Sequence, residues 1–332
     1  MPRTSASLSD PDLRTALADG LDRAPDPETA RMARFLADAF GPSALAIVHY
    51  GSQIRPADAR PESAHDFFVV LERYGEGYRS LAARVGTRYS PRTAALLNRI
   101  LPPNVIAVAV PGPGGSRTAK CVVLSLGDLA RACSARARDH FAQARLIQEV
   151  QLLWTHDPTS RRAVLDALLE ARARTFDWGR CFLPSSFDVE EFCRVLLATS
   201  FASEIRPEGT ERASELVAAQ REALRRAYAP LLRHLAGLGV LSREGEVYRD
   251  LHPPGRLERL GAAIYFKQSK ARSTLRWLKY VALYDDWLDY LVRKVERRGG
   301  IKIELTPRER RWPLLFLWPR AVRFILGRNR QL

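Results

Sequence analysis

Cysteine is scarce in this chain, and its spacing excludes two kinds of stabilising site. The 332 residues include four cysteines, none in a CxxC pair and none with a histidine at zinc-finger spacing. Structural zinc sites and disulfide frameworks depend on such spacings, so neither is predicted. The free thiols fit a reducing compartment, and a cytoplasmic location is therefore expected.

Long apolar runs are also missing. The N-terminal segment carries Asp10, Asp12 and Asp19 and has no apolar stretch of the kind found in secretory signals. Near the other end, the uncharged run after Arg311 stops at Pro319, well short of the ~20 apolar residues that a spanning helix requires. The sequence therefore predicts neither a signal peptide nor a transmembrane helix.

Negative charge is in deficit, because the formal net charge is +15. Twelve basic and three acidic residues lie after Leu291, so most of the excess belongs to the C-terminal end. Such an imbalance predicts an anionic partner: nucleotide phosphate, nucleic acid or acidic lipid. Because the charge is concentrated at one end, we expect no specific nucleic-acid partner.

The last part of the chain mixes arginine with bulky apolar side chains. Residues 311–328 alternate tryptophan, leucine and phenylalanine with arginine. This composition is typical of segments that lie in the headgroup region of an anionic membrane. The alternative is a terminal segment that packs on the surface of the protein itself.

The order of the expected elements predicts an α+β protein. Length fits two domains and a tail, and we place them at residues 1–125, 126–300 and 301–332. Hydrophobic runs predict a helix at residues 29–40 and then strands at 44–49, 67–71, 105–110 and 120–124. Helical periodicity follows near residues 140–154, 160–173, 189–202, 213–235 and 273–296, with a short hairpin at 239–248. The second domain is therefore mainly helical, in the manner of a winged helix.

The segment between the first two strands has the pattern of a phosphate-binding site. Gly51 and Ser52 directly follow a buried strand, where backbone N–H groups and a hydroxyl can meet nucleotide phosphates. Asp66 opens the next strand and can hold the Mg²⁺ that bridges those phosphates. This order predicts a small mixed sheet of the polymerase β-like nucleotidyltransferase type.

One residue departs from that type. Such enzymes carry a second carboxylate two residues after the first, and here that position is Phe68. Glu72 lies on the same strand face as Asp66 but ~20 Å away, so it cannot share a metal with Asp66.

A series of short motifs in a matching order resembles the mitochondrial translocator assembly and maintenance protein family, soluble-type phosphatidate cytidylyltransferases. The matching segments are Tyr50-Gly51-Ser52, Asp66 with its apolar strand, Arg88-Tyr89-Ser90, Lys120 with residues 126–129, Ala144-Arg145-Leu146, residues 183–187, residues 200–206 and Tyr228-Ala229-Pro230. Ala144, Ser203 and Glu204 depart from the family pattern, which has glycine at the first two positions and aspartate at the third.

The resemblance implies an enzyme on the inner face of the cell membrane that makes CDP-diacylglycerol and pyrophosphate from CTP and phosphatidic acid. It also implies roles for particular residues. Gly51 and Ser52 hold the triphosphate, Asp66 and Glu204 bind Mg²⁺, Lys120 and Arg145 neutralise phosphate charge, Tyr89 and Ser90 contact base or ribose, and Arg206 completes the site.

Several alternatives stay open at the level of sequence. Lys120 can be a solvated strand-end lysine, Arg145 a surface ion-pair partner, and residues 202–204 an ordinary loop. The acceptor can be RNA, a protein hydroxyl or another anionic lipid. Because the second carboxylate is missing, a non-catalytic module that binds nucleotide or membrane is a further alternative.

Overall fold

The computed structural model describes residues 8–54, 64–204, 210–283, 305, 306 and 308. The chain forms two compact units, Met1–Lys279 and Tyr280–Leu332, and the first is described below. Most of the predicted tail at 301–332 lies outside the described residues. Among the described residues, no helix is long and apolar enough to cross a membrane.

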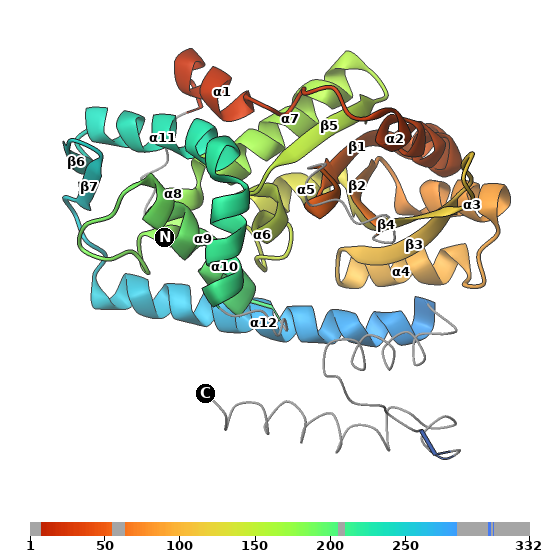
Figure 1. Ribbon diagram of the computed structural model, residues 1–332. Coiled ribbons are helices and arrows are strands. Elements are labelled where there is room, and N and C mark those ends of the chain that lie inside the picture. The colour runs from red at the N-terminus through yellow and green to blue at the C-terminus, as the bar shows by residue number, and fades with distance from the viewer. Residues whose placement is uncertain (1–7, 55–63, 205–209, 284–304, 307, 309–332) are drawn as a thin grey trace. The chain divides into compact units, whose positions relative to one another are not determined.

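Helices and strands alternate irregularly along the first unit (Figure 1). The strands are β1 (Ala44–Tyr50), β2 (His65–Leu71), β3 (Asn104–Val110), β4 (Arg117–Ser125), β5 (Val150–Thr155), β6 (Leu241–Glu244) and β7 (Val247–Asp250). The helices are α1 (Pro11–Ala18), α2 (Pro27–Phe40), α3 (Tyr74–Val85), α4 (Pro91–Ile100), α5 (Leu126–Cys133), α6 (Gln143–Leu146), α7 (Pro158–Ala173), α8 (Thr175–Gly179), α9 (Val189–Ala202), α10 (Thr210–Ala219), α11 (Arg221–Gly237) and α12 (Arg256–Leu283).

The main sheet is mixed, with strand order β3-β4-β2-β1-β5. Only β2 and β4 pair in parallel, and the other neighbours are antiparallel. The α+β class, the four predicted strands and the β3–β4 hairpin are thereby confirmed. The register sets Tyr50 beside Asp66, and Asp66 beside Lys120, so these three residues share one sheet face.

The fifth strand corrects a prediction. A helix was expected over residues 140–154, but only α6 is helical there, and β5 pairs with β1 at the sheet edge. An apolar run of this length fits either a strand or a buried helix, and the free edge of β1 decides for the strand. The sheet therefore receives a strand from beyond residue 125, and the predicted domain boundaries stay predictions.

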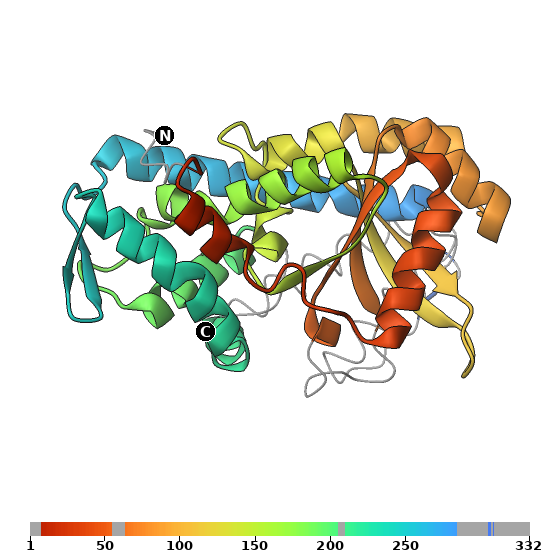
Figure 2. The ribbon, with the colours of Figure 1, turned by 90° about the horizontal axis from the view of Figure 1, so that it is seen from above.

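Helix α2 covers one face of the sheet (Figure 2). Asp26 caps its first turn, and its buried side carries Met32 and Leu36. Its Thr29 hydroxyl lies 3.4 Å from His65 Nδ1, on the face opposite Asp66. Asp66 and Lys120 therefore point away from α2, toward a face where β3 leaves alternate residues exposed.

The remaining helices follow the predicted order with shifted ends. The predicted helix at 213–235 is two helices, α10 and α11, and Pro230 lies inside α11. The hairpin at 239–248 is confirmed as β6 and β7. Helix α12 begins at Arg256, well before residue 273, because its first turns bury Ala262 and Phe266.

Basic side chains in the last turns of α12 donate hydrogen bonds to the edge of the sheet. Lys279 Nζ donates to Pro103 O and Asn104 Oδ1, both at 2.8 Å, and also to Leu101 O. Arg276 donates to Pro102 O in the same turn. Helix α12 is thus joined to the α4–β3 turn by charge-assisted hydrogen bonds.

Candidate functional site

Asp66 and Lys120 meet across the parallel pair of strands. Lys120 Nζ lies 3.4 Å from Asp66 Oδ1, and the two side chains are 43% and 25% exposed. At this exposure the ion pair contributes little to stability, so both groups are free to meet a ligand. The predicted acid and the predicted phosphate-binding lysine are therefore brought together.

Gly51 closes tightly over Asp66. Its φ of +94° lies in the region that favours glycine. A Cβ at this position would lie 3.0 Å from Asp66 Oδ2, nearer than side-chain carbons normally come. Ser52, which follows, is exposed and begins a short 3₁₀ turn. The positive φ and the close carboxylate together favour glycine between strand β1 and Asp66.

Arg145 approaches the same face from the helical part of the chain. It donates Nη1 to Glu204 Oε1 at 2.5 Å and Nη2 to Glu204 Oε2 at 3.1 Å, and both side chains are buried. Its guanidinium carbon lies 3.6 Å from the centre of the Phe141 ring. The guanidinium therefore also makes a cation–π contact with Phe141.

Asp66 is one of the groups that act electrostatically on Arg145. Burial alone would lower its pKa, but Glu204, and more weakly Tyr50 and Asp66, raise the pKa above its ordinary value. Arg145 is therefore a permanent cation, and the negative charge of Asp66 on β2 helps to keep it protonated. This proximity arises because α6 leads into β5 and β5 pairs with β1.

Residues that the sequence analysis did not select surround Phe141, the ring that contacts Arg145. Arg276 lies 4.9 Å from the Phe141 ring centre and pairs with Asp139, which also accepts 2.8 Å from Arg272 Nε. Asp139 further accepts from the Phe141 backbone N–H at 3.2 Å. The only sequence signal is the spacing of the two arginines, one helical turn apart.

Two predicted contacts lie elsewhere. Tyr89 packs edge-on against Tyr78, with ring centroids 6.4 Å apart. Tyr78 bonds Asn104, which alternation places on the sheet face opposite Lys120. Tyr89 and the adjacent Ser90 are therefore not brought together with Asp66 and Lys120. Arg206 lies outside the described residues.

Of the two carboxylates predicted to bind Mg²⁺, Asp66 and Glu204, only Asp66 could do so without losing bonds to Arg145. Both oxygens of Glu204 accept from Arg145, so this residue orients the arginine. In the described part of the chain, no three His, Cys, Asp or Glu side chains form a metal cage. Asp66 alone, together with nucleotide phosphates, matches the way Mg²⁺ commonly binds with one or two protein carboxylates.

Comparison with known proteins adds no relative. No protein-family model matches the chain, and no curated protein matches it either. The family resemblance in the motifs stays a prediction.

Proposed function

We propose that this protein is a Mg²⁺-dependent nucleotidyltransferase that uses CTP and phosphatidic acid. The observation that carries the proposal is the packing of the Gly51 turn on Asp66, with Lys120 3.4 Å from the same carboxylate on an open sheet face. A backbone turn, a metal-binding acid and a cation in this order suit a triphosphate. These are the residues of the polymerase β-like pattern expected from the sequence.

The chemistry is an in-line substitution at the α-phosphorus. A phosphate oxygen of phosphatidic acid forms the new P–O bond, and the bond between the α-phosphorus and the bridging oxygen breaks. Pyrophosphate leaves with the electron pair. A phosphate nucleophile is already anionic, so no general base is required, and catalysis rests on positioning and charge neutralisation.

Each residue has a part in that substitution. Asp66 would hold a Mg²⁺ ion, which would supply positive charge to the reacting phosphates. Lys120 stabilises the leaving pyrophosphate. Arg145, held by both oxygens of Glu204, adds positive charge for the phosphates. The Gly51 turn lets the triphosphate approach the backbone of β1.

The lipid acceptor is supported by the outer side of α12. Leu257, Leu260, Ile264 and Leu275 recur at helical spacing and are each more than half exposed. Exposed cations, among them Lys267, accompany this stripe, and Glu258 is the only acidic residue of α12. An apolar stripe with basic flanks is typical of helices that lie on anionic membranes.

A coupled assay tests the proposal. With CTP, Mg²⁺ and phosphatidic acid vesicles, purified protein is expected to release pyrophosphate and form CDP-diacylglycerol. Asp66→Asn is expected to reduce the rate by about 100-fold or more, whereas Glu72→Gln, an exposed acid directly after β2, leaves it unchanged. Pyrophosphate without the lipid product would assign another acceptor, such as RNA or a protein hydroxyl.

A second candidate is a module that binds nucleotide without turnover. It is favoured by Phe68, which is buried and packs with its ring centroid 4.8 Å from that of Tyr50 where related enzymes carry a second carboxylate. Such a module binds CTP in calorimetry but releases no pyrophosphate with any nucleotide. That result would refute the enzymatic proposal.

A further inference from the structure

Helix α4 has an exposed side that mixes apolar and basic residues. Leu96 and Ile100 are 57% and 65% exposed, and Arg92 and Arg99 are exposed as well. Because an α-helix turns by about 100° per residue, these four side chains lie on the side opposite the buried Ala94. We call these four residues the α4 face.

The stretch of chain that contains the α4 face has no acidic residue. Between Glu76 and Asp128 the sequence has seven basic residues and no aspartate or glutamate; the basic residues are Arg79, Arg84, Arg88, Arg92, Arg99, Arg117 and Lys120. Helix α4 packs chiefly on α3 and β3, both fully described by the structure, and the only acid on them is Glu76. Glu76 already pairs with Arg73, at 2.8 Å. The neighbouring elements therefore do not neutralise the α4 face.

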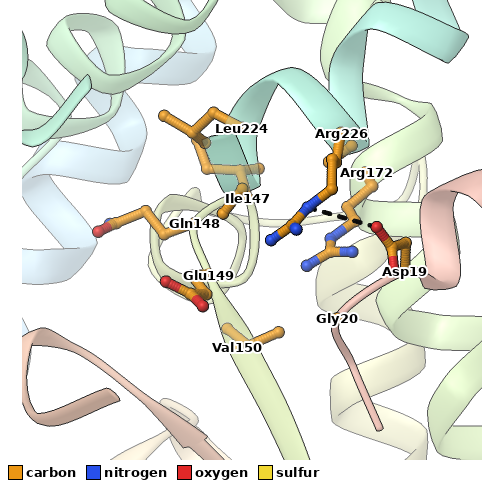
Figure 3. Close-up of a pocket in the computed structure, with 11 residues that line it drawn as sticks. Asp19, Gly20, Ile147, Gln148, Glu149, Val150, Arg172, Leu224 and Arg226 are labelled. Atoms are coloured by element: carbon orange, nitrogen blue, oxygen red, sulfur yellow. Dashed lines mark ion pairs between the residues drawn. The ribbon is translucent and has the colours of Figure 1, made fainter. Parts of the chain in front are cut away.

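Two other arginine-rich places in the described chain have acids beside their arginines. On α11, Arg221 lies 3.1 Å from Glu190. The small cavity between α7, β5 and α11 is lined by two acidic and two basic side chains, Asp19, Glu149, Arg172 and Arg226 (Figure 3). Charge is balanced within the protein at those places, whereas the α4 face needs a negative partner from outside.

The apolar side chains decide which class of anionic partner fits. Free phosphate or nucleic acid can pair with Arg92 and Arg99, but neither removes Leu96 and Ile100 from water. An anionic bilayer does both, because acidic headgroups meet the arginines while the apolar side chains enter the hydrocarbon. Long arginine side chains can keep their charge at headgroup level beside such an insertion.

We propose that the α4 face binds an anionic lipid bilayer, as a second membrane contact beside the one proposed for α12. The two helices meet at the α4–β3 turn (Figure 1), where Arg276 and Lys279 donate to Pro102 O and Pro103 O. Leu275, which precedes Arg276, is 52% exposed. Two contacts on joined helices bind one bilayer more tightly than either alone, so loss of one weakens binding.

The inference deepens the proposed function and rests on its assignment of a membrane substrate. Its test is nevertheless separate, because vesicle flotation with phosphatidylcholine and phosphatidylglycerol needs neither CTP nor Mg²⁺. The full chain is expected to float with these vesicles and to bind much less to phosphatidylcholine alone. Failure to bind the anionic vesicles would overturn the inference. Normal flotation without turnover would refute only the proposed enzymatic activity.

The basic half of the α4 face is tested by charge removal. Arg92→Gln/Arg99→Gln is expected to weaken binding to the anionic vesicles by about 30-fold, because each arginine near an acidic surface contributes to binding. The control Arg162→Gln/Arg249→Gln removes the same charge from exposed positions on α7 and β7 and is expected to bind normally. Equal loss in both double variants would show that net charge alone matters and would overturn the assignment to α4.

The apolar half is tested at constant charge. Leu96→Gln/Ile100→Gln is expected to weaken binding by about 100-fold, because two apolar side chains no longer enter the lipid. Leu238→Gln/Val247→Gln changes two exposed apolar residues elsewhere and is expected to bind as the unaltered protein does. Unchanged binding of the α4 variant would contradict insertion.

A fluorescent probe reports insertion directly. The cysteines of the chain are buried, so an environment-sensitive label is directed to the new thiol in Ile100→Cys. With anionic vesicles its emission is expected to shift to the blue and to be quenched by brominated acyl chains, whereas a label in Leu238→Cys does not respond. A response to RNA or inorganic phosphate but not to vesicles would overturn the proposal in favour of another anionic partner.

Discussion

At the scale of single residues, variants of the Arg145–Glu204 pair can distinguish a role in stability from a role in catalysis. The pair is buried, so each partner is costly without the other. Glu204 also holds both ends of the guanidinium fork, which fixes its direction. Removal of one partner and removal of both therefore have different expected outcomes.

We expect Glu204→Gln to lower the free energy of unfolding by about 3 kcal/mol, because it leaves the Arg145 charge buried without a carboxylate. The double variant Arg145→Met/Glu204→Leu is expected to regain most of this loss, since apolar groups of similar size can replace a buried pair. Urea unfolding measures both. Pyrophosphate release is expected to stay low in the double variant, and its full recovery would show that Arg145 has no catalytic part.

Two buried histidines predict acid sensitivity. Burial, aided by the nearby His65, lowers the pKa of His49 to about 4, and burial lowers that of His140 to about 3. The unfolded chain binds these protons near pH 6.5, before the folded chain does, so stability falls as pH drops below about 6.5 toward those values. At pH 5 each histidine is expected to cost about 2 kcal/mol.

Urea unfolding at pH 7.5 and pH 5.0 measures this effect. In His140→Phe the difference between the two pH values is expected to shrink by about 2 kcal/mol, because the phenyl ring binds no proton. His252→Gln, at an exposed position, serves as the control and keeps the full difference. An unchanged difference in His140→Phe would contradict the assignment.

The three predicted site residues that the structure brings together on the sheet have local surroundings. Gly51 and Asp66 lie at the ends of consecutive strands, and Lys120 follows from the next strand pair. Asp139 and Arg276 escaped attention because 137 positions separate them, and no periodic pattern connects residues at such a distance. Tyr89 was assigned from a motif alone, and packing against Tyr78 gives it a different neighbourhood.

At the scale of elements, α12 has two faces with different tasks. Its inner face carries the cations that bind the α4–β3 turn and Asp139, and its outer face carries the leucine and isoleucine stripe. The first face supports the candidate site. The second is the face for which we propose lipid contact.

We expect Leu260→Gln/Ile264→Gln to weaken binding to phosphatidic acid vesicles by about 100-fold, because two apolar side chains no longer enter the lipid. Vesicle flotation measures the bound fraction. Leu238→Gln changes an exposed leucine outside α12 and is expected to bind as the unaltered protein does. Equal flotation of the double variant and the control would remove α12 from the membrane contact.

Strand β5 illustrates how element type depends on partners. Residues 150–155 contain enough apolar side chains for a helix or a strand, and the sequence-based assignment was helix. The antiparallel partner β1 lies about a hundred positions earlier, so the deciding hydrogen bonds were invisible in a local window. The β6–β7 hairpin, whose strands are adjacent, was predicted correctly.

At the scale of the whole molecule, the sequence yielded the α+β class and the order of most elements, while the joins between them came only from the structure. Composition and periodicity report which faces are apolar, but they do not report which faces meet. The attachment of α12 to the sheet through Lys279 is such a join, since it links helix and turn across more than 170 positions.

The position of β1 between β2 and β5 has a consequence for synthesis on the ribosome. Six of the seven residues of β1 are buried in the folded protein. Until β5 has been synthesised, one edge of this apolar strand has unpaired backbone groups and can pair with other chains. The edge is covered only after Thr155 has left the ribosome, since β5 ends there. The nascent chain therefore passes through an aggregation-prone interval that a chaperone or rapid elongation must bridge.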